Sequence, residues 1–220
     1  MKSDLGLGHS GIVREPAVHA DCLVVLLHGL GSKASFMLPL VNAIASELPT
    51  VAAVALDGIE PFDKAPVGRQ WFSTKGITRD NRCERIEACL PSVCAVIGHL
   101  QKRFNVPPER TALVGFSQGA MIAFQIAATR DPPAAVVALA GRLSTAVTIF
   151  GTRRPPMLIS LGDKDAVISL EEGAHAARTF SDAGYPVEMQ VIAGHGHSIS
   201  DPQLAKCVAF LKACFSSHPG

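Results

Sequence analysis

Short apolar runs alternate with amphipathic stretches along most of this chain. Continuous apolar runs predict strands that are buried on both faces, and they lie at 22–29, 50–57, 111–116, 134–141 and 156–162, with a partly alternating run at 185–194. Helical spacing of apolar residues predicts helices at 35–48, 86–104, 118–130, 169–183 and after 201. Strands that alternate with helices favour an α/β fold with a mainly parallel central sheet and helices on both faces.

Local signals sharpen some of these boundaries. Ser169 and Glu172 have the spacing of a capping box, and Asp201 followed by Pro202 is typical of a helix start. Pro91 lies inside a helical stripe and is expected to kink or split that helix. The segment 58–81 interrupts the alternation, and a loop of that length is usually functional or partly structured.

Composition narrows the class of protein further. The 220 residues contain no internal repeat or linker-like shift, so residues 1–220 are expected to form a single domain. A net charge of +1 supplies no basic surface for a polyanion, which argues against nucleic acid as a partner. The beginning of the chain lacks the apolar stretch of a signal peptide, and the run at 22–30 is too short to span a membrane. We therefore expect a soluble cytoplasmic protein without stable membrane insertion.

The six cysteines do not indicate a disulfide scaffold or a metal site. They form no CxxC pair, and no group of Cys and His residues has the spacing of a zinc site. They are expected to be free thiols in a reducing compartment, and no metal is expected.

The stretch "GFSQG" at 115–119 is the first candidate for chemistry. It follows an apolar strand and opens a helical pattern, which is the context in which Gly-x-Ser-x-Gly presents a serine at a sharp, strained turn. The flanking glycines lack the Cβ atoms that would clash there. The alternative is a glycine-rich turn with an incidental serine. The pattern predicts Ser117 as a nucleophile.

A serine nucleophile needs a general base, and that base needs an acid to orient it. Of the acids after the serine, Asp163 and Asp165 alone directly follow a strand, and Asp165 is preferred because Asp163 is still at the strand end. His195 and His197 both lie between the last strand and the last helix. His197 is the preferred base, but the residues themselves leave His195 as a rival.

A tetrahedral oxyanion needs two preorganised donors. One is expected to be the main-chain N–H of Gln118, directly after the nucleophile at a helix N-terminus. The other is expected from the glycine-containing loop after the first buried strand, where Leu30 N–H is the candidate. The alternative is a plain strand-to-helix loop. His28 precedes the serine and is expected to brace this loop rather than to catalyse.

Together these segments resemble the α/β-hydrolase superfamily and, more narrowly, the phospholipase/carboxylesterase family that includes acyl-protein thioesterases. The resemblance runs through "LLHGLG" (26–31), "QWFS" (70–73), "LVGFSQGA" (113–120), "ALAGRL" (138–143), "LGDKDAVIS" (161–169) and "GHGHSIS" (194–200). It implies Ser117, Asp165 and His197 as a catalytic triad, and so selects His197 over His195. It also implies Leu30 and Gln118 as the oxyanion donors.

The resemblance also implies a function. We expect a serine hydrolase that cleaves small esters or thioesters with short-to-medium acyl groups through an acyl-serine, with no cofactor. Other hydrolase activities, such as dienelactone or peptide cleavage, and a non-catalytic binding scaffold are the alternatives. Trp71 is a candidate lining residue of the acyl site or, equally, a loop anchor. Ser32 and Ser73 depart from the family pattern around the substrate pockets. A homodimer rests on the family alone.

Overall fold

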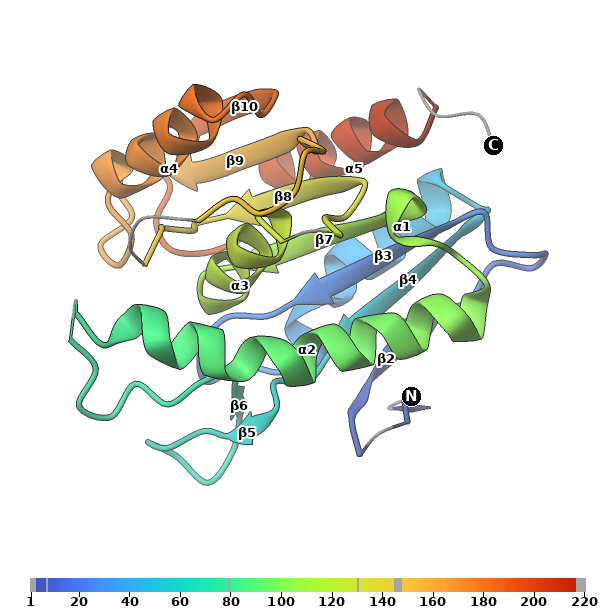
Figure 1. The fold of residues 1–220 in the computed structure, drawn as a ribbon, viewed down its shortest axis with the longest axis horizontal. Coiled ribbons are helices and arrows are strands. Elements are labelled where there is room, and N and C mark those ends of the chain that lie inside the picture. The colour runs from blue at the N-terminus through green and yellow to red at the C-terminus, as the bar shows by residue number, and fades with distance from the viewer. Residues whose placement is uncertain (1–2, 7, 79, 130, 145–147, 217–220) are drawn as a thin grey trace.

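The computed structural model describes residues 3–6, 8–78, 80–129, 131–144 and 148–216. Its centre is an eight-stranded sheet, mainly parallel, as predicted (Figure 1). From β4 through β10 the strands run parallel, whereas β2 pairs antiparallel with β4, and β1 pairs antiparallel with β2. The strands in spatial order are β1 (Ser3–Asp4), β2 (Ser10–Arg14), β4 (Val51–Leu56), β3 (Cys22–Leu27), β7 (Thr111–Phe116), β8 (Ala135–Leu139), β9 (Met157–Gly162) and β10 (Val187–Ile192).

Helices cover both faces of the sheet because its central strands are apolar on both faces. Along β3, Leu23 and Val25 pack into one core and Val24 and Leu26 into the other. The first core contains apolar residues of α2 (Arg82–Phe104), α3 (Gln118–Ala127) and α4 (Leu170–Asp182), and the second contains those of α1 (Leu38–Glu47) and α5 (Asp201–Ser216). Figure 1 shows α2 and α3 on one side of the sheet and α1 on the other. The predicted fold class is confirmed.

Some local expectations differ from the structure. The strands β1 and β2 and the small hairpin β5 (Glu60–Pro61)–β6 (Arg69–Gln70) were not predicted. Pro91 does not split its helix. The helix α2 is continuous from Arg82 to Phe104, and Pro91 is an exposed residue inside it. A carbonyl that loses its partner at such an exposed position is hydrated by water, so the helix continues.

The parallel strands end at one edge of the sheet, and this edge gathers the candidate residues. Leu27 of β3 lies in register with Gly115 of β7, and Gly162 of β9 with Ile192 of β10. The loops after these strands carry Leu30, Ser117, Asp165 and His197, as the crevice rule for open parallel sheets anticipates.

The described residues contain neither a membrane-spanning helix nor a disulfide. None of their helices combines the length and the apolar character needed to cross a membrane. They include all six cysteines, and no disulfide joins any two of these.

Candidate active site

Ser117 occupies a strained turn between β7 and α3. Its φ of 53° and ψ of −111° lie in a region that L-residues rarely adopt. The Ser117 N–H donates to the Leu139 carbonyl at 2.9 Å, which holds the turn against β8. A Cβ on Gly115 would lie 2.5 Å from the Ala120 nitrogen, and one on Gly119 would overlap the Leu27 carbonyl oxygen. The two glycines therefore allow strand and helix to approach closely enough to form the turn.

We expect Gly119→Ala to destabilise the protein. The new methyl would displace the backbone of β3, and overpacking of this kind costs about 1–3 kcal/mol or more. The matched control is Gly98→Ala in α2, where a Cβ meets nothing within 4 Å and alanine favours the helix by about 1 kcal/mol. Thermal unfolding should show a lower Tm for Gly119→Ala and an equal or higher Tm for Gly98→Ala. Equal Tm values for Gly119→Ala and the unmodified chain would contradict this account.

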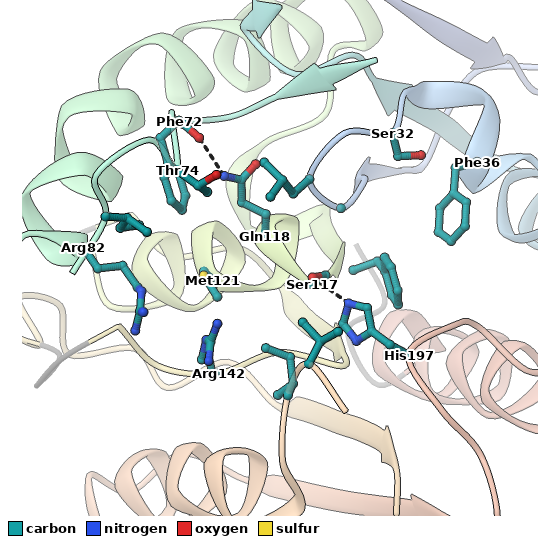
Figure 2. Close-up of a pocket in the computed structure, with 16 residues that line it drawn as sticks. Ser32, Phe36, Phe72, Thr74, Arg82, Ser117, Gln118, Met121, Arg142 and His197 are labelled. Atoms are coloured by element: carbon teal, nitrogen blue, oxygen red, sulfur yellow. Dashed lines mark hydrogen bonds between the residues drawn. The ribbon is translucent and has the colours of Figure 1, made fainter. Parts of the chain in front are cut away.

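A hydrogen-bonded chain joins three of the predicted residues. His197 Nε2 lies 2.9 Å from Ser117 Oγ (Figure 2), and on the other side of the ring His197 Nδ1 lies 2.7 Å from Asp165 Oδ2. The Asp165 carboxylate only accepts, so Nδ1 carries a proton and donates it. In the neutral ring, Nε2 then presents its lone pair to the Ser117 hydroxyl.

The Asp165 carboxyl is held ionised. Its side chain has no exposed surface, and burial alone would raise its pKa. The main-chain N–H groups of Ile168 and Val167 donate to Oδ1 at 2.9 and 2.8 Å, and His197 donates to Oδ2. These bonds outweigh burial and hold the pKa below its ordinary value. Asp165 therefore remains an acceptor that fixes the tautomer of His197.

The two rival residues have other partners. Asp163 Oδ1 accepts the N–H of Gly194 at 2.7 Å, so its carboxylate ties the loop after β9 to the loop after β10. His195 lies beside Ser198, with Nε2 at 3.0 Å from the Ser198 carbonyl oxygen. Neither is hydrogen-bonded to Ser117 or His197.

The predicted oxyanion donors lie on either side of Ser117. Gln118 begins α3, so its N–H is at the positive end of the helix dipole and lacks an intrahelical acceptor. Leu30 follows Gly29, where an added Cβ would lie 3.2 Å from the Ser117 Cβ. Gly31 has φ +74°, and its N–H donates to the Arg69 carbonyl at 2.9 Å, which anchors the turn to β6.

His28 braces this loop from inside the protein. Its side chain is fully buried, Nε2 accepts the N–H of Gly58 at 2.9 Å, and Nδ1 lies 2.6 Å from the Gly29 carbonyl oxygen. Burial lowers the pKa of His28, which favours the neutral ring that these two bonds require. The placement agrees with a bracing role.

Trp71 does not line the cavity, so of the two alternatives, an acyl-site residue or a loop anchor, its placement agrees with the second. Its side chain is 1% exposed, and its indole Nε1–H donates to the His28 carbonyl oxygen at 2.8 Å. The Gln118 side chain holds the same segment, accepting from Trp71 N–H at 2.9 Å and donating to the Phe72 carbonyl at 2.8 Å (Figure 2). Trp71 is thus a loop anchor, and its neighbour Phe72 faces the cavity.

We expect Trp71→Phe to change stability rather than specificity. The buried carbonyl of His28 would lose its donor, which costs about 1–3 kcal/mol. Relative kcat/KM values for esters of different chain length should stay as in the unmodified protein. The comparison variant is Phe72→Leu, which reshapes the cavity wall and should alter those ratios. Altered ratios for Trp71→Phe, with unchanged thermal unfolding, would contradict the anchoring role.

A cavity of about 390 Å³ opens beside Ser117 and is mainly apolar. Sequence reasoning missed most of its wall, because the residues come from six separate segments without a shared pattern. Two arginines, Arg82 and Arg142, are part of this wall. The lining residues are Gly29, Leu30, Ser32, Phe36, Phe72, Thr74, Ile77, Arg82, Phe116, Ser117, Gln118, Met121, Arg142, Val167, Ile168 and His197.

No group of three or more His, Cys, Asp or Glu side chains in the described part of the chain could hold a metal ion.

Known proteins resemble this chain over nearly its whole length. A family model described as Phospholipase/Carboxylesterase matches residues 9–215. Esterase YpfH of Escherichia coli (strain K12) is 32% identical over 208 residues, which cover 94% of this chain and 89% of the relative. Acyl-protein thioesterase 1 homolog 1 of Dictyostelium discoideum is 24% identical and covers 93% of this chain and 95% of its own.

Solved structures resemble it equally broadly. Esterase PE8 matches with a TM-score of 0.86 and 28% identity, over 94% of this chain and 99% of that one. The Bacillus cereus carboxylesterase matches with a TM-score of 0.82 over 96% of each chain, but at 16% identity this is a likeness of fold alone.

Proposed function

The chain belongs to the phospholipase/carboxylesterase family, with its α/β-hydrolase fold, and on that premise we propose that it cleaves esters or thioesters of short-to-medium acyl groups through an acyl-serine on Ser117. It is an enzyme of the esterase and thioesterase type. The observation that carries the finer proposal is the hydrogen-bonded chain from Ser117 through His197 to Asp165, at 2.9 and 2.7 Å, at the wall of an apolar cavity.

Acylation begins at the Ser117 hydroxyl. His197 Nε2 accepts its proton while Oγ attacks the carbonyl carbon, and Asp165 stabilises the imidazolium that forms. The carbonyl oxygen becomes an oxyanion, for which the N–H groups of Leu30 and Gln118 are the donors. When the bond to the leaving group breaks, His197 returns the proton to the departing alkoxide or thiolate.

Deacylation repeats these steps with water. His197 removes a proton from water as the oxygen attacks the acyl carbon, and the proton then passes to the departing Ser117 oxygen. Each step uses groups of this chain and water, so the proposal requires no cofactor. The moderate volume of the cavity favours small, single-chain acyl substrates.

The test is a substrate series with a chemical label. We expect hydrolysis of p-nitrophenyl esters from acetate to laurate and of acyl-thioesters of matched chain length, with an optimum at short or medium length. A fluorophosphonate should form one covalent adduct, found by mass spectrometry on the peptide that contains Ser117. A folded protein that reacts with neither series and is not labelled would refute the proposal, and cleavage of peptides alone would replace it.

The homodimer and the cytoplasmic location remain predictions. Sedimentation velocity of the purified protein tests the first, and fractionation of expressing cells tests the second.

A further inference from the structure

One end of the cavity is cationic, although the rest of its wall is mainly apolar. Arg82, from the first turn of α2, and Arg142, from the loop after β8, both line it. Figure 2 shows both guanidinium groups on the same side of Ser117, with Met121 nearby and His197 on the opposite side. Guanidinium groups at the wall of a mainly apolar cavity favour an anionic ligand, because a charge that is partly removed from water is stabilised by an opposite charge.

Arg142 is held in place but retains donor capacity. Its terminal Nη1 donates to Glu172 Oε1 at 2.7 Å, and its side chain is 24% exposed. Its Nε atom is buried and has no hydrogen-bond partner. A ligand would therefore contact the exposed part of the Arg142 side chain rather than this atom.

Thr74 provides a second unsatisfied group in the same wall. Its Oγ1 is also buried without a hydrogen-bond partner. Thr74, Arg142 and the second arginine therefore line one cavity, and an anionic ligand with several oxygens is the kind of ligand that such a wall would bind.

No Asp or Glu is among the residues that line the cavity, whereas two arginines are. Glu172 is the carboxylate paired with Arg142, and its other oxygen accepts the N–H of Ser169 at 3.0 Å in the capping box of α4. Glu172 is thus committed to the helix start and offsets at most one of the two guanidinium charges. The charged side chains that line this end of the cavity are both arginines.

We propose that Arg82, Arg142 and Thr74 bind a carboxylate at the far end of the acyl chain, so that the preferred substrates are monoesters or monothioesters of dicarboxylic acids. This inference rests on the proposed acyl-serine function. His197 protonates the leaving group, so the leaving group must lie on the His197 side of Ser117. The acyl chain then extends the other way, past Met121 toward the arginines (Figure 2). The planar guanidinium fork matches the geometry of a carboxylate.

The experiment compares three kinds of 4-nitrobenzyl ester. The first are monoesters of dicarboxylic acids from glutaric to suberic, the second are their uncharged carboxamide counterparts, and the third are plain alkanoates. A fourth substrate, a 4-carboxybenzyl alkanoate, places the anion on the alcohol instead. We expect kcat/KM for the best monoester to exceed that of its carboxamide by about tenfold to a hundredfold, as for a hydrogen bond to a charged group.

Three single variants test which residues produce the preference for a terminal carboxylate. Arg82→Gln and Arg142→Gln should each reduce the ratio of carboxylate to carboxamide kcat/KM by about tenfold, whatever they do to the absolute rates. Arg178→Gln removes the same charge from an exposed site on α4, outside the cavity, and should keep both the rates and the ratio. If Arg142→Gln fails to fold, the result for Arg82→Gln still tests the proposed anion site.

The possible outcomes distinguish a failure of the proposed anion site from a failure of the proposed hydrolase function. Serine-dependent hydrolysis of alkanoates with a carboxylate-to-carboxamide ratio at or below one would overturn the anion site and leave the hydrolase proposal intact. So would a ratio that both arginine variants retain. A preference for the 4-carboxybenzyl alkanoate alone would place the anion on the leaving group and overturn the orientation. Absence of hydrolysis for every ester would overturn the function itself.

Discussion

Ser117→Ala is expected to reduce kcat/KM for every ester and thioester by at least about 10⁴-fold, because the attacking oxygen is removed while the rest of the site remains. Alanine differs from serine by one oxygen atom, and Ser117 N–H can still donate to the Leu139 carbonyl at the same turn. The Tm should therefore stay close to that of the unmodified protein. Stopped assays with purified protein, run beside thermal unfolding, measure both quantities.

The matched control is Ser181→Ala, on an exposed position of α4. It should retain full activity and full labelling by a fluorophosphonate, whereas Ser117→Ala should lose both. Residual turnover of Ser117→Ala within tenfold of the unmodified rate would mean that another group, or a directly activated water, attacks the carbonyl. The acyl-serine step would then be wrong.

Asp165→Asn should be nearly as damaging, with a fall in kcat/KM of about 10³- to 10⁴-fold near neutral pH. The asparagine oxygen would be directed to the N–H groups of Val167 and Ile168, which donate to Asp165 Oδ1. The amide NH₂ would then face His197 Nδ1 and favour the tautomer with the proton on Nε2. That ring could not accept the proton of Ser117.

Asp163→Asn is the control for this prediction, since it makes the same chemical change two residues away. Asp163 accepts the N–H of Gly194, and an asparagine oxygen can do the same, so activity should change by less than about threefold. Comparable losses in the two variants would show that the loop position, rather than the tautomer of His197, governs the rate. A larger loss for Asp163→Asn would transfer the role of the acid to Asp163.

The central fold could be predicted because its strands are continuous apolar runs separated by helical patterns. The elements that were missed are short strands that do not form continuous apolar runs. The strand β2 is five residues long and exposed at one end, and β5 and β6 are two residues each and pair with one another. Pro91 was expected to kink or split its helix; it does not split it, because its exposed position makes the lost hydrogen bond tolerable.

The candidate site residues were likewise predictable where the signal is local and missed where it depends on distant segments. Ser117, Asp165 and His197 could be proposed because each follows a strand in a recognisable short motif. The direction of the Trp71 side chain could not be predicted, because it depends on Gln118 and His28, which are both more than forty residues away. Arg82 lies in none of the quoted motifs, and Arg142 lies in "ALAGRL" without a role that the sequence assigns. Only the structure shows that the two residues line the same cavity.

Gln118 has a consequence for attempts to redesign this protein. Its main-chain N–H is a proposed oxyanion donor, while its side chain holds the backbone of Trp71 and Phe72. The proposed catalytic role and the anchoring of the loop therefore depend on one residue, and a foreign loop grafted next to Gln118 would disturb both. Diversity is better introduced beyond it, at Thr74, Ile77 and Arg82, where libraries can alter the choice of substrate and leave the means of cleavage untouched.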